Sequence, residues 1–143
     1  MPFESLCMME RVPDPPESIP ESHRDLLQSR VAIMATVGPD GRPQVSALWF
    51  LAQDGTVKVS LNTSRQKTKN LRRNPKVSVV LLDHANPHRY VELRGDAEIQ
   101  PDSDYKFADL VGAKYGVDLR SRDRPGESRV IVTIHPVRAR PWG

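Results

Sequence analysis

Arg65 and Lys67 have the clearest chemical potential in this sequence. They lie in the segment 64–71 (SRQKTKNL), which should form a helix over 65–73 that ends before Pro75, because proline disfavours helical conformation in the preceding residue. A helix N-terminus has unpaired N–H groups and a partial positive charge, so acidic residues are preferred there. A bound phosphate would accept those N–H groups, the hydroxyl of the expected cap Ser64, and both cations. The segment therefore predicts a phosphate site.

Helical spacing separates the basic residues of this segment. Lys67 lies four positions before Leu71, the only apolar residue of the helix, whose face must pack on the rest of the protein. Lys67 is therefore expected to point into a cleft, whereas Lys69 and Arg72 should face solvent. Arg65 and Lys67 are the candidate ligands.

The charge distribution also indicates an anionic partner. The formal net charge of the 143 residues is only +3, yet no acidic residue occurs between Asp54 and Asp83, where seven basic side chains gather: Lys58, Arg65, Lys67, Lys69, Arg72, Arg73 and Lys76. A nucleic-acid binder would need aromatic side chains beside such a block for base stacking. Aromatic residues make up 6% of the chain and none lies between Phe50 and Tyr90. We therefore expect no nucleic-acid partner.

The elements that position these residues are mostly strands. Apolar runs and alternation predict six strands, and Gly38-Pro39-Asp40-Gly41 and Asp54-Gly55 are typical turns between them. The strands are expected over 31–37, 42–52, 57–62, 77–82, 89–99 and 129–135. Three short helices are expected, with Ser22, Ser64 and either Asp102 or Ser103 as caps. Hairpin-like spacing without helical crossovers indicates a mainly β, antiparallel barrel or open roll.

Composition sets the domain boundary and several exclusions. Prolines and acidic residues are frequent in residues 1–20, which predicts a disordered arm before a domain of 21–143. The alternative is an arm that lies over a partner subunit. The single Cys7 forms no internal disulfide, and the four histidines fit no common metal-ligand spacing, so no metal is expected. No stretch approaches about 18 apolar residues and the N-terminus lacks a secretory pattern, which predicts a cytoplasmic protein without membrane contact.

Two segments together resemble a known superfamily. The strand 43–50 (PQVSALWF), followed by Ser64-Arg65-x-Lys67-x-x-Asn70-Leu71, resembles the pyridoxamine-phosphate-oxidase-like FMN-binding split β-barrels over about residues 26–134. The continuation Arg72-Arg73-Asn74-Pro75 is most similar to the B group of actinobacterial flavin/deazaflavin oxidoreductases, which use coenzyme F420. The resemblance implies a six-stranded antiparallel split β-barrel and a homodimer with cofactor sites at the subunit interface. The C-terminus, 138–143 (RARPWG), lacks the Arg-Leu-x-Pro ending of vitamin B6 oxidases, so that activity is not expected.

The resemblance also implies a set of cofactor-binding residues. The cofactor ring should contact the strand near Ser46, Ala47 and Leu48, and the next strand should flank the ring and its phosphoryl linkage with Ser60, Asn62 and Thr63. Arg65, Lys67 and Thr68 should bind the phosphate. His88 and Tyr90 should come from the other subunit. Trp49 is either a core or interface aromatic or a wall of this pocket. Arg120, Arg122 and Arg124 form a salt-bridged loop or a site for the polyglutamate tail of the deazaflavin.

No nucleophile–base constellation is present, so no catalytic side chain is predicted. The cofactor itself would supply the redox chemistry, while the protein orients it. The expected function is an oxidoreductase in which reduced coenzyme F420 delivers a hydride to a small conjugated or unsaturated acceptor. An FMN-dependent oxidoreductase and a non-enzymatic flavin or deazaflavin carrier are the alternatives.

Overall fold

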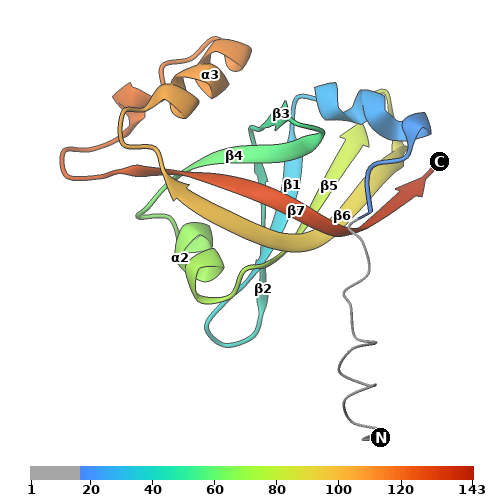
Figure 1. Cartoon of the computed structure of the whole chain (residues 1–143), viewed down its shortest axis with the longest axis horizontal. Helices are drawn as coiled ribbons and strands as arrows, with labels where there is room; N and C mark the ends of the chain where they lie inside the picture. Colours follow the sequence, from blue (N-terminus) through green and yellow to red (C-terminus); the bar gives the residue numbers. More distant parts are fainter. Residues whose placement is uncertain (1–16) are drawn as a thin grey trace, which may run out of the picture.

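The computed structural model describes residues 17–143, which form one antiparallel sheet curled into a split barrel (Figure 1). Its seven strands follow the order β2-β1-β5-β6-β7-β4-β3. They are β1 (Ala32–Val37), β2 (Pro43–Leu48), β3 (Leu51–Gln53), β4 (Thr56–Asn62), β5 (Lys76–Asp83), β6 (Asn86–Pro101) and β7 (Arg129–Trp142). The mainly β, split-barrel fold is confirmed, with seven strands rather than six.

The core lies inside the curled sheet. Strands β1, β4 and β5 alternate buried and partly exposed residues, as period-two patterning predicts. Among the fully buried side chains are Met34, Val59 and Leu81, one from each of these strands. The same alternation leaves Ile33, Val80 and Leu82 on the outer surface, only half-buried.

The predicted strand 42–52 is wrong in one respect, because it breaks at Trp49 and Phe50. The side chain of Phe50 is fully buried, and its backbone N–H donates to the Tyr115 hydroxyl at 3.1 Å. The Phe50 carbonyl accepts hydrogen bonds from the Tyr115 hydroxyl and from Lys114 Nζ. These hydrogen bonds from the helix Lys106–Tyr115 therefore take the place of strand pairing at Phe50, and β3 begins after it.

Strands β6 and β7 are longer than predicted, with 16 and 14 residues. They pair along most of their length and carry a register shift at Arg94/Gly95. A Cβ at Gly95 would clash with the carbonyl oxygen of His135 on β7. Glycine therefore permits the close approach of the two long strands that curls the sheet.

Four helical segments complete the fold: η1 (Glu21–Gln28), α2 (Gln66–Arg73), α3 (Lys106–Tyr115) and η2 (Arg120–Arg122). Ser22 does not cap η1, because the cap position is Pro20 and the Ser22 hydroxyl contacts His23 instead. The cap position of α3 is Tyr105 rather than Asp102, yet the Asp102 carboxylate accepts the backbone N–H groups of Phe107 and Ala108 from three residues before that position. No described helix is long and apolar enough to cross a membrane.

The predicted arm 1–20 is largely outside the described residues. Its last residues, however, contact the barrel. Ile19 is only 3% exposed and belongs to the core. The Glu17 carboxylate accepts the backbone N–H of Ala139 and pairs with Arg140. The ordered chain therefore includes at least residues 17–20 in addition to the predicted domain.

Candidate functional site

Helix α2 is held in one rotation by its buried face. Leu71 is 1% exposed, and the equally buried Asn70 amide donates to Thr36 Oγ1 on β1 and Gln44 Oε1 on β2, each at 3.1 Å. Satisfied polar bonds of this kind fix a helix against a sheet more specifically than apolar contact alone. Lys67 consequently points toward β2, while Lys69 and Arg72 are exposed, as the helical spacing predicted.

Lys67 and Arg65 form the first positive rim of the site, the α2 rim. Lys67 Nζ donates to Ser46 Oγ at 3.0 Å, and its other protons have no acceptor within residues 17–143. Among residues 17–143, no carboxylate forms an ion pair with either cation. Partial burial and the neighbouring Arg65 charge both lower the pKa of Lys67. Two adjacent, unneutralised cations at a helix N-terminus favour a bound anion.

Ser64 does not cap α2, contrary to expectation. The cap position is Arg65, and no side chain in the described part of the chain bonds the free N–H groups of the first turn. The backbone N–H and the hydroxyl of Ser64 both donate to Asn62 Oδ1, at 2.8 and 2.7 Å. Asn62 therefore turns the chain between β4 and α2, and the N-terminus of α2 has no side-chain acceptor of its own.

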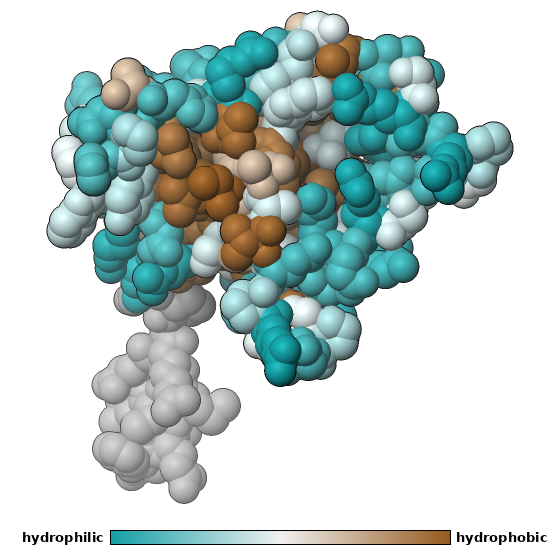
Figure 2. All heavy atoms as spheres, turned by 180° about the vertical axis from the view of Figure 1, so that it is seen from behind, coloured by the Kyte–Doolittle hydropathy of each residue, from teal (hydrophilic) through white to brown (hydrophobic). Residues whose placement is uncertain are grey.

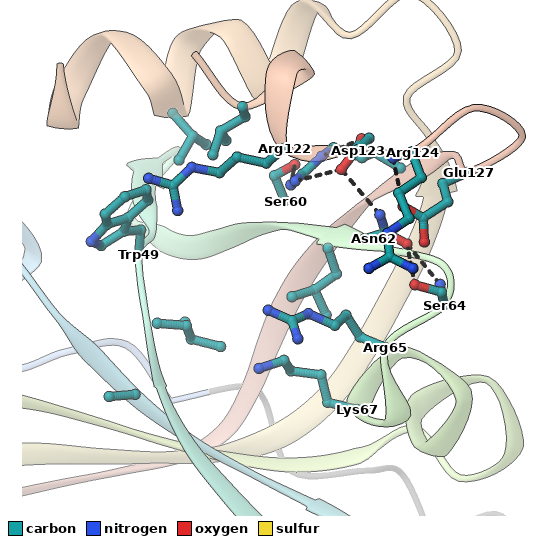
Figure 3. Close-up of a pocket in the computed structure, with 16 residues that line it drawn as sticks. Trp49, Ser60, Asn62, Ser64, Arg65, Lys67, Arg122, Asp123, Arg124 and Glu127 are labelled. Carbon is teal, nitrogen blue, oxygen red and sulfur yellow. Dashed lines mark hydrogen bonds and ion pairs between the residues drawn. The ribbon is translucent and has the colours of Figure 1, made fainter. Parts of the chain in front are cut away.

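The α2 rim opens into a cavity of about 600 Å³ (Figure 3). Its walls come from β2, β4, α3, the start of β7 and the loop between α3 and β7. The lining residues are Ala47, Leu48, Trp49, Ser60, Leu61, Asn62, Ser64, Arg65, Lys67, Val111, Leu119, Arg122, Asp123, Arg124, Glu127 and Arg129. This volume is within the range of small-molecule and cofactor sites.

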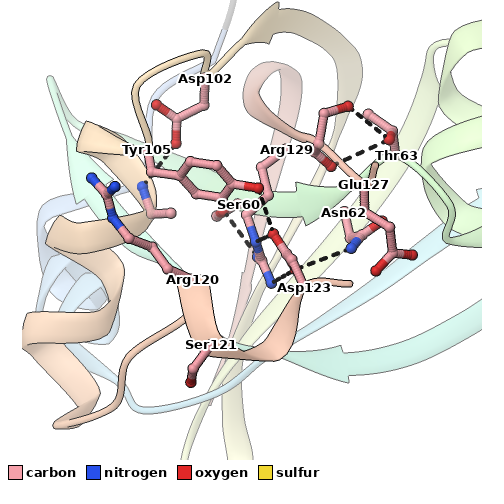
Figure 4. A network of polar contacts seen from close by, with 12 residues as sticks. Ser60, Asn62, Thr63, Asp102, Tyr105, Arg120, Ser121, Asp123, Glu127 and Arg129 are labelled. Carbon is pink, nitrogen blue, oxygen red and sulfur yellow. Dashed lines mark hydrogen bonds and ion pairs between the residues drawn. The ribbon is translucent and has the colours of Figure 1, made fainter. Parts of the chain in front are cut away.

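A buried ion pair supports the opposite side of the cavity (Figure 4). Arg129, at the start of β7, donates to both Asp123 oxygens at 2.8 and 2.9 Å, and the two side chains are 9% and 5% exposed. Asn62 and the Tyr105 hydroxyl also donate to Asp123. Burial alone would raise the pKa of Asp123, but these hydrogen bonds and the Arg129 charge outweigh it and lower the pKa. The pair holds the loop 119–128 against β4.

The three arginines of that loop lie in different surroundings. Arg120 pairs with Asp109 on α3, as expected of a salt-bridged loop. Arg122 instead extends across the cavity to Trp49, with its guanidinium carbon 5.1 Å from the indole centroid (Figure 3). Trp49 in turn stacks on Tyr115, with ring centroids 4.8 Å apart. Arg124 also lines the cavity. We call Arg122, Asp123 and Arg129 the loop rim.

The structure brings together only part of the predicted cofactor-binding set. Six of its members line the cavity: Ala47, Leu48, Ser60, Asn62, Arg65 and Lys67. Ser46 lies behind them as the acceptor for Lys67. Thr63 bonds Ser128, and the fully buried Thr68 donates to the Asn62 carbonyl, so neither hydroxyl points into the cavity.

His88 and Tyr90 lie apart from this cavity in the same chain. Both are on β6, where Tyr90 lines a separate groove with Leu82 and Trp142. Their predicted role was to reach the site of a second subunit. The separation within one chain agrees with that expectation and does not test it.

Sequence reasoning missed the loop rim as a structural unit. Asp123 and Arg129 are six residues apart on either side of a turn. Neither helical nor strand periodicity predicts that side chains at this spacing will pair. Arg122 and Arg124 were singled out only through their charge. Trp49, for which core and pocket-wall roles were both open, is a wall of the cavity.

Comparisons with known proteins agree with this geometry. The family model for pyridoxamine 5'-phosphate oxidase matches residues 19–143. A solved F420 reductase is 35% identical, with a TM-score of 0.74 over 85% of this chain and 98% of that chain. The conserved hypothetical protein Rv2991 from Mycobacterium tuberculosis is 33% identical, with a TM-score of 0.68 over 83% of this chain and 81% of that chain.

A more distant structure shares the fold alone. The haem storage protein HutZ from Vibrio cholerae is 20% identical, with a TM-score of 0.65 over 89% of this chain and 96% of that chain.

The family as a whole binds flavins and includes oxidoreductases. With the split barrel, the α2 rim and the matching family model in place, the chain belongs to the pyridoxamine 5'-phosphate oxidase family.

Proposed function

We propose that this protein is an oxidoreductase that binds coenzyme F420 in the cavity between the α2 rim and the loop rim. The observation that supports this most is the pair Arg65 and Lys67, which line the cavity without a carboxylate partner in the described chain. Unpaired cations at a helix N-terminus are a donor set suited to a phosphoryl group.

The residues of the cavity fit a phosphorylated, ring-bearing cofactor. Arg65, Lys67 and the open first-turn N–H groups of α2 would hold the phosphoryl group, and Ala47 and Leu48 of the β2 wall would contact the ring. When bound, a reduced deazaflavin supplies a hydride for a small conjugated or unsaturated acceptor. The apolar residues Leu61, Val111 and Leu119 limit water on one side of the cavity. The protein thus contributes binding and orientation.

Coenzyme F420 is favoured over FMN by the 35% identity to an F420 reductase across 98% of that chain. Titration of the purified protein with each cofactor, followed by fluorescence, tests the choice. We expect tighter binding of coenzyme F420. A protein that purifies with stoichiometric FMN would assign the site to FMN. Tight cofactor binding without reduction of any acceptor in a panel of quinones and enones would indicate the carrier alternative.

We further propose that the protein is a homodimer whose subunits complete each other's cavities. Figure 2 shows a hydrophobic patch on the face opposite the view of Figure 1, over the side of the barrel where β1 and β5 lie. The outward-facing Ile33 and Val80 are paired across these strands, and Ile33 is also paired with Ala47, which lines the cavity. An apolar surface that continues into a ligand site is suited to a second subunit.

Solution mass, with and without cofactor, tests this assembly. We expect a dimer at micromolar concentration, and Val80→Glu should convert it to a monomer that binds the cofactor more weakly. A wild-type monomer with full cofactor affinity would rule out the shared site.

A further inference from the structure

Arg122 is the cavity residue that the proposed cofactor site does not explain. Its guanidinium lies over Trp49, and Figure 3 shows it on the opposite side of the cavity from Arg65 and Lys67. No hydrogen bond links its side chain to any other part of residues 17–143, and no carboxylate pairs with it there. A charged group that ends in a binding cavity with no hydrogen-bond or ion-pair partner is a candidate for ligand recognition.

The two carboxylates that line the cavity with Arg122, Asp123 and Glu127, are already engaged. Asp123 accepts hydrogen bonds from Arg129, Asn62 and Tyr105. Glu127 accepts the backbone N–H of Arg124 at 2.7 Å. Neither carboxylate can turn to Arg122 without breaking bonds that hold the loop. The positive charge of Arg122 is therefore directed into the cavity rather than neutralised by its own loop.

The aromatic stack fixes where that charge lies. Trp49 is stacked on Tyr115 with an interplanar angle of 15°, and the Tyr115 hydroxyl is bonded to the Phe50 backbone at 3.1 Å. A guanidinium over such a ring is attracted to its face, while its N–H donors, which lie at the edge of its own plane, remain available. The fork of N–H groups matches a carboxylate in a bidentate arrangement.

We propose that Arg122 selects the substrate: the acceptor of the proposed reaction is a flat conjugated carboxylic acid whose carboxylate binds Arg122. This inference rests on the proposed function, because it assigns the α2 rim to the cofactor phosphate and the loop rim to the acceptor. The apolar walls Leu48, Val111 and Leu119 suit the hydrocarbon part of such an acid. Arg122 acts here as a specificity-determining residue.

Binding measurements test the proposal without turnover. Cinnamate and its uncharged amide, cinnamamide, are titrated by calorimetry into the protein, alone and saturated with oxidised coenzyme F420. We expect wild type to prefer cinnamate, and Arg122→Gln to weaken cinnamate binding about 10-fold or more while cinnamamide changes less than about twofold. Arg122→Lys should restore part of the cinnamate affinity. Arg72→Gln, an exposed change on α2, is the matched control and should alter neither titration.

The possible failures are distinguishable. Equal weakening of cinnamate and cinnamamide by Arg122→Gln would show a packing role for Arg122 and overturn the proposal. Loss of coenzyme F420 affinity in Arg122→Gln, with FMN affinity unchanged, would assign the bound carboxylate to the polyglutamate tail of the cofactor and also overturn it. If Lys67→Ala leaves cofactor binding intact, the proposed function fails. That result is distinct from the cinnamate test, because the preference for cinnamate that depends on Arg122 is measured on the protein without cofactor.

Discussion

The two rims of the cavity are positively charged but are built in different ways. The α2 rim comes from one short segment, in which Arg65 and Lys67 are two residues apart and share one helix end. The loop rim depends on contacts between residues far apart in sequence, such as Arg129 with Ser60 and Asn62 with Asp123. The cations of the α2 rim have no carboxylate partner among the described residues, whereas Arg129 is neutralised and buried. The α2 rim is therefore suited to bind an anion, whereas most contacts of the loop rim fix the loop against the sheet.

The largest expected effect concerns the buried pair of the loop rim. Asp123→Ala leaves Arg129 buried without its partner and should lower the free energy of unfolding by about 3–5 kcal/mol, measured by urea denaturation. The matched control is Asp109→Ala, which removes the partner of Arg120 where both side chains are about half exposed. That change should cost far less, because solvent screens an exposed ion pair. Equal losses in the two variants would show that burial does not distinguish the two pairs.

A smaller effect is expected at the α2 rim, and on binding rather than on folding. Lys67→Ala should weaken cofactor binding by about 1.5–3 kcal/mol, since it removes a charge-assisted hydrogen bond. Lys69→Ala, on the exposed face of α2, should cost much less because solvent screens its charge. Fluorescence titration of both variants at one salt concentration measures the difference. Similar losses would indicate a diffuse basic surface instead of a site.

The pH dependence of binding should also report on Lys67. Because the pKa of Lys67 in the protein without ligand is lowered, its charge is lost as the pH rises through a value below the ordinary value of about 10.4. Cofactor affinity should therefore be constant at neutral pH and begin to fall in the alkaline range before an ordinary lysine would titrate. Lys67→Arg, which stays charged, is the control that isolates ionisation of the cofactor itself. Identical pH profiles for wild type and Lys67→Arg would contradict this assignment.

The smallest effect is expected for Ser64→Ala. A serine that caps a helix contributes about 1 kcal/mol to stability. Ser64 instead bonds Asn62 at an exposed position, so its loss should change the free energy of unfolding by no more than about 0.5 kcal/mol. Urea denaturation compares it with Asn62→Ala, which removes the acceptor of both Ser64 bonds and should cost more. A full capping loss in Ser64→Ala would mean that Ser64 does cap α2.

The accuracy of the sequence predictions follows the range of the interactions involved. The orientation of Lys67 was predictable because helical spacing from Leu71 is local. The break at Trp49 and Phe50 was not, because the partner that replaces the sheet is Tyr115, 65 residues away. The cap at Ser64 was wrong for a related reason: the Asn62 side chain accepts hydrogen bonds from the N–H and hydroxyl of Ser64 and holds it in a turn before the cap position, a local alternative that helix-start patterns do not weigh.

The sequence by itself determined the strand periodicity, the acid-free basic block and the helix whose N-terminal end carries two cations, because each depends on the order of neighbouring side chains. Only the tertiary structure decided which of the loop arginines reach the cavity and which are neutralised. Arg120, Arg122 and Arg129 have the same side chain, yet one pairs with α3, one lies over Trp49 and one is buried with Asp123. The physical reason is that the environment of a charge depends on what folding brings beside it. Here those partners come from α3, the break between β2 and β3, and the loop before β7.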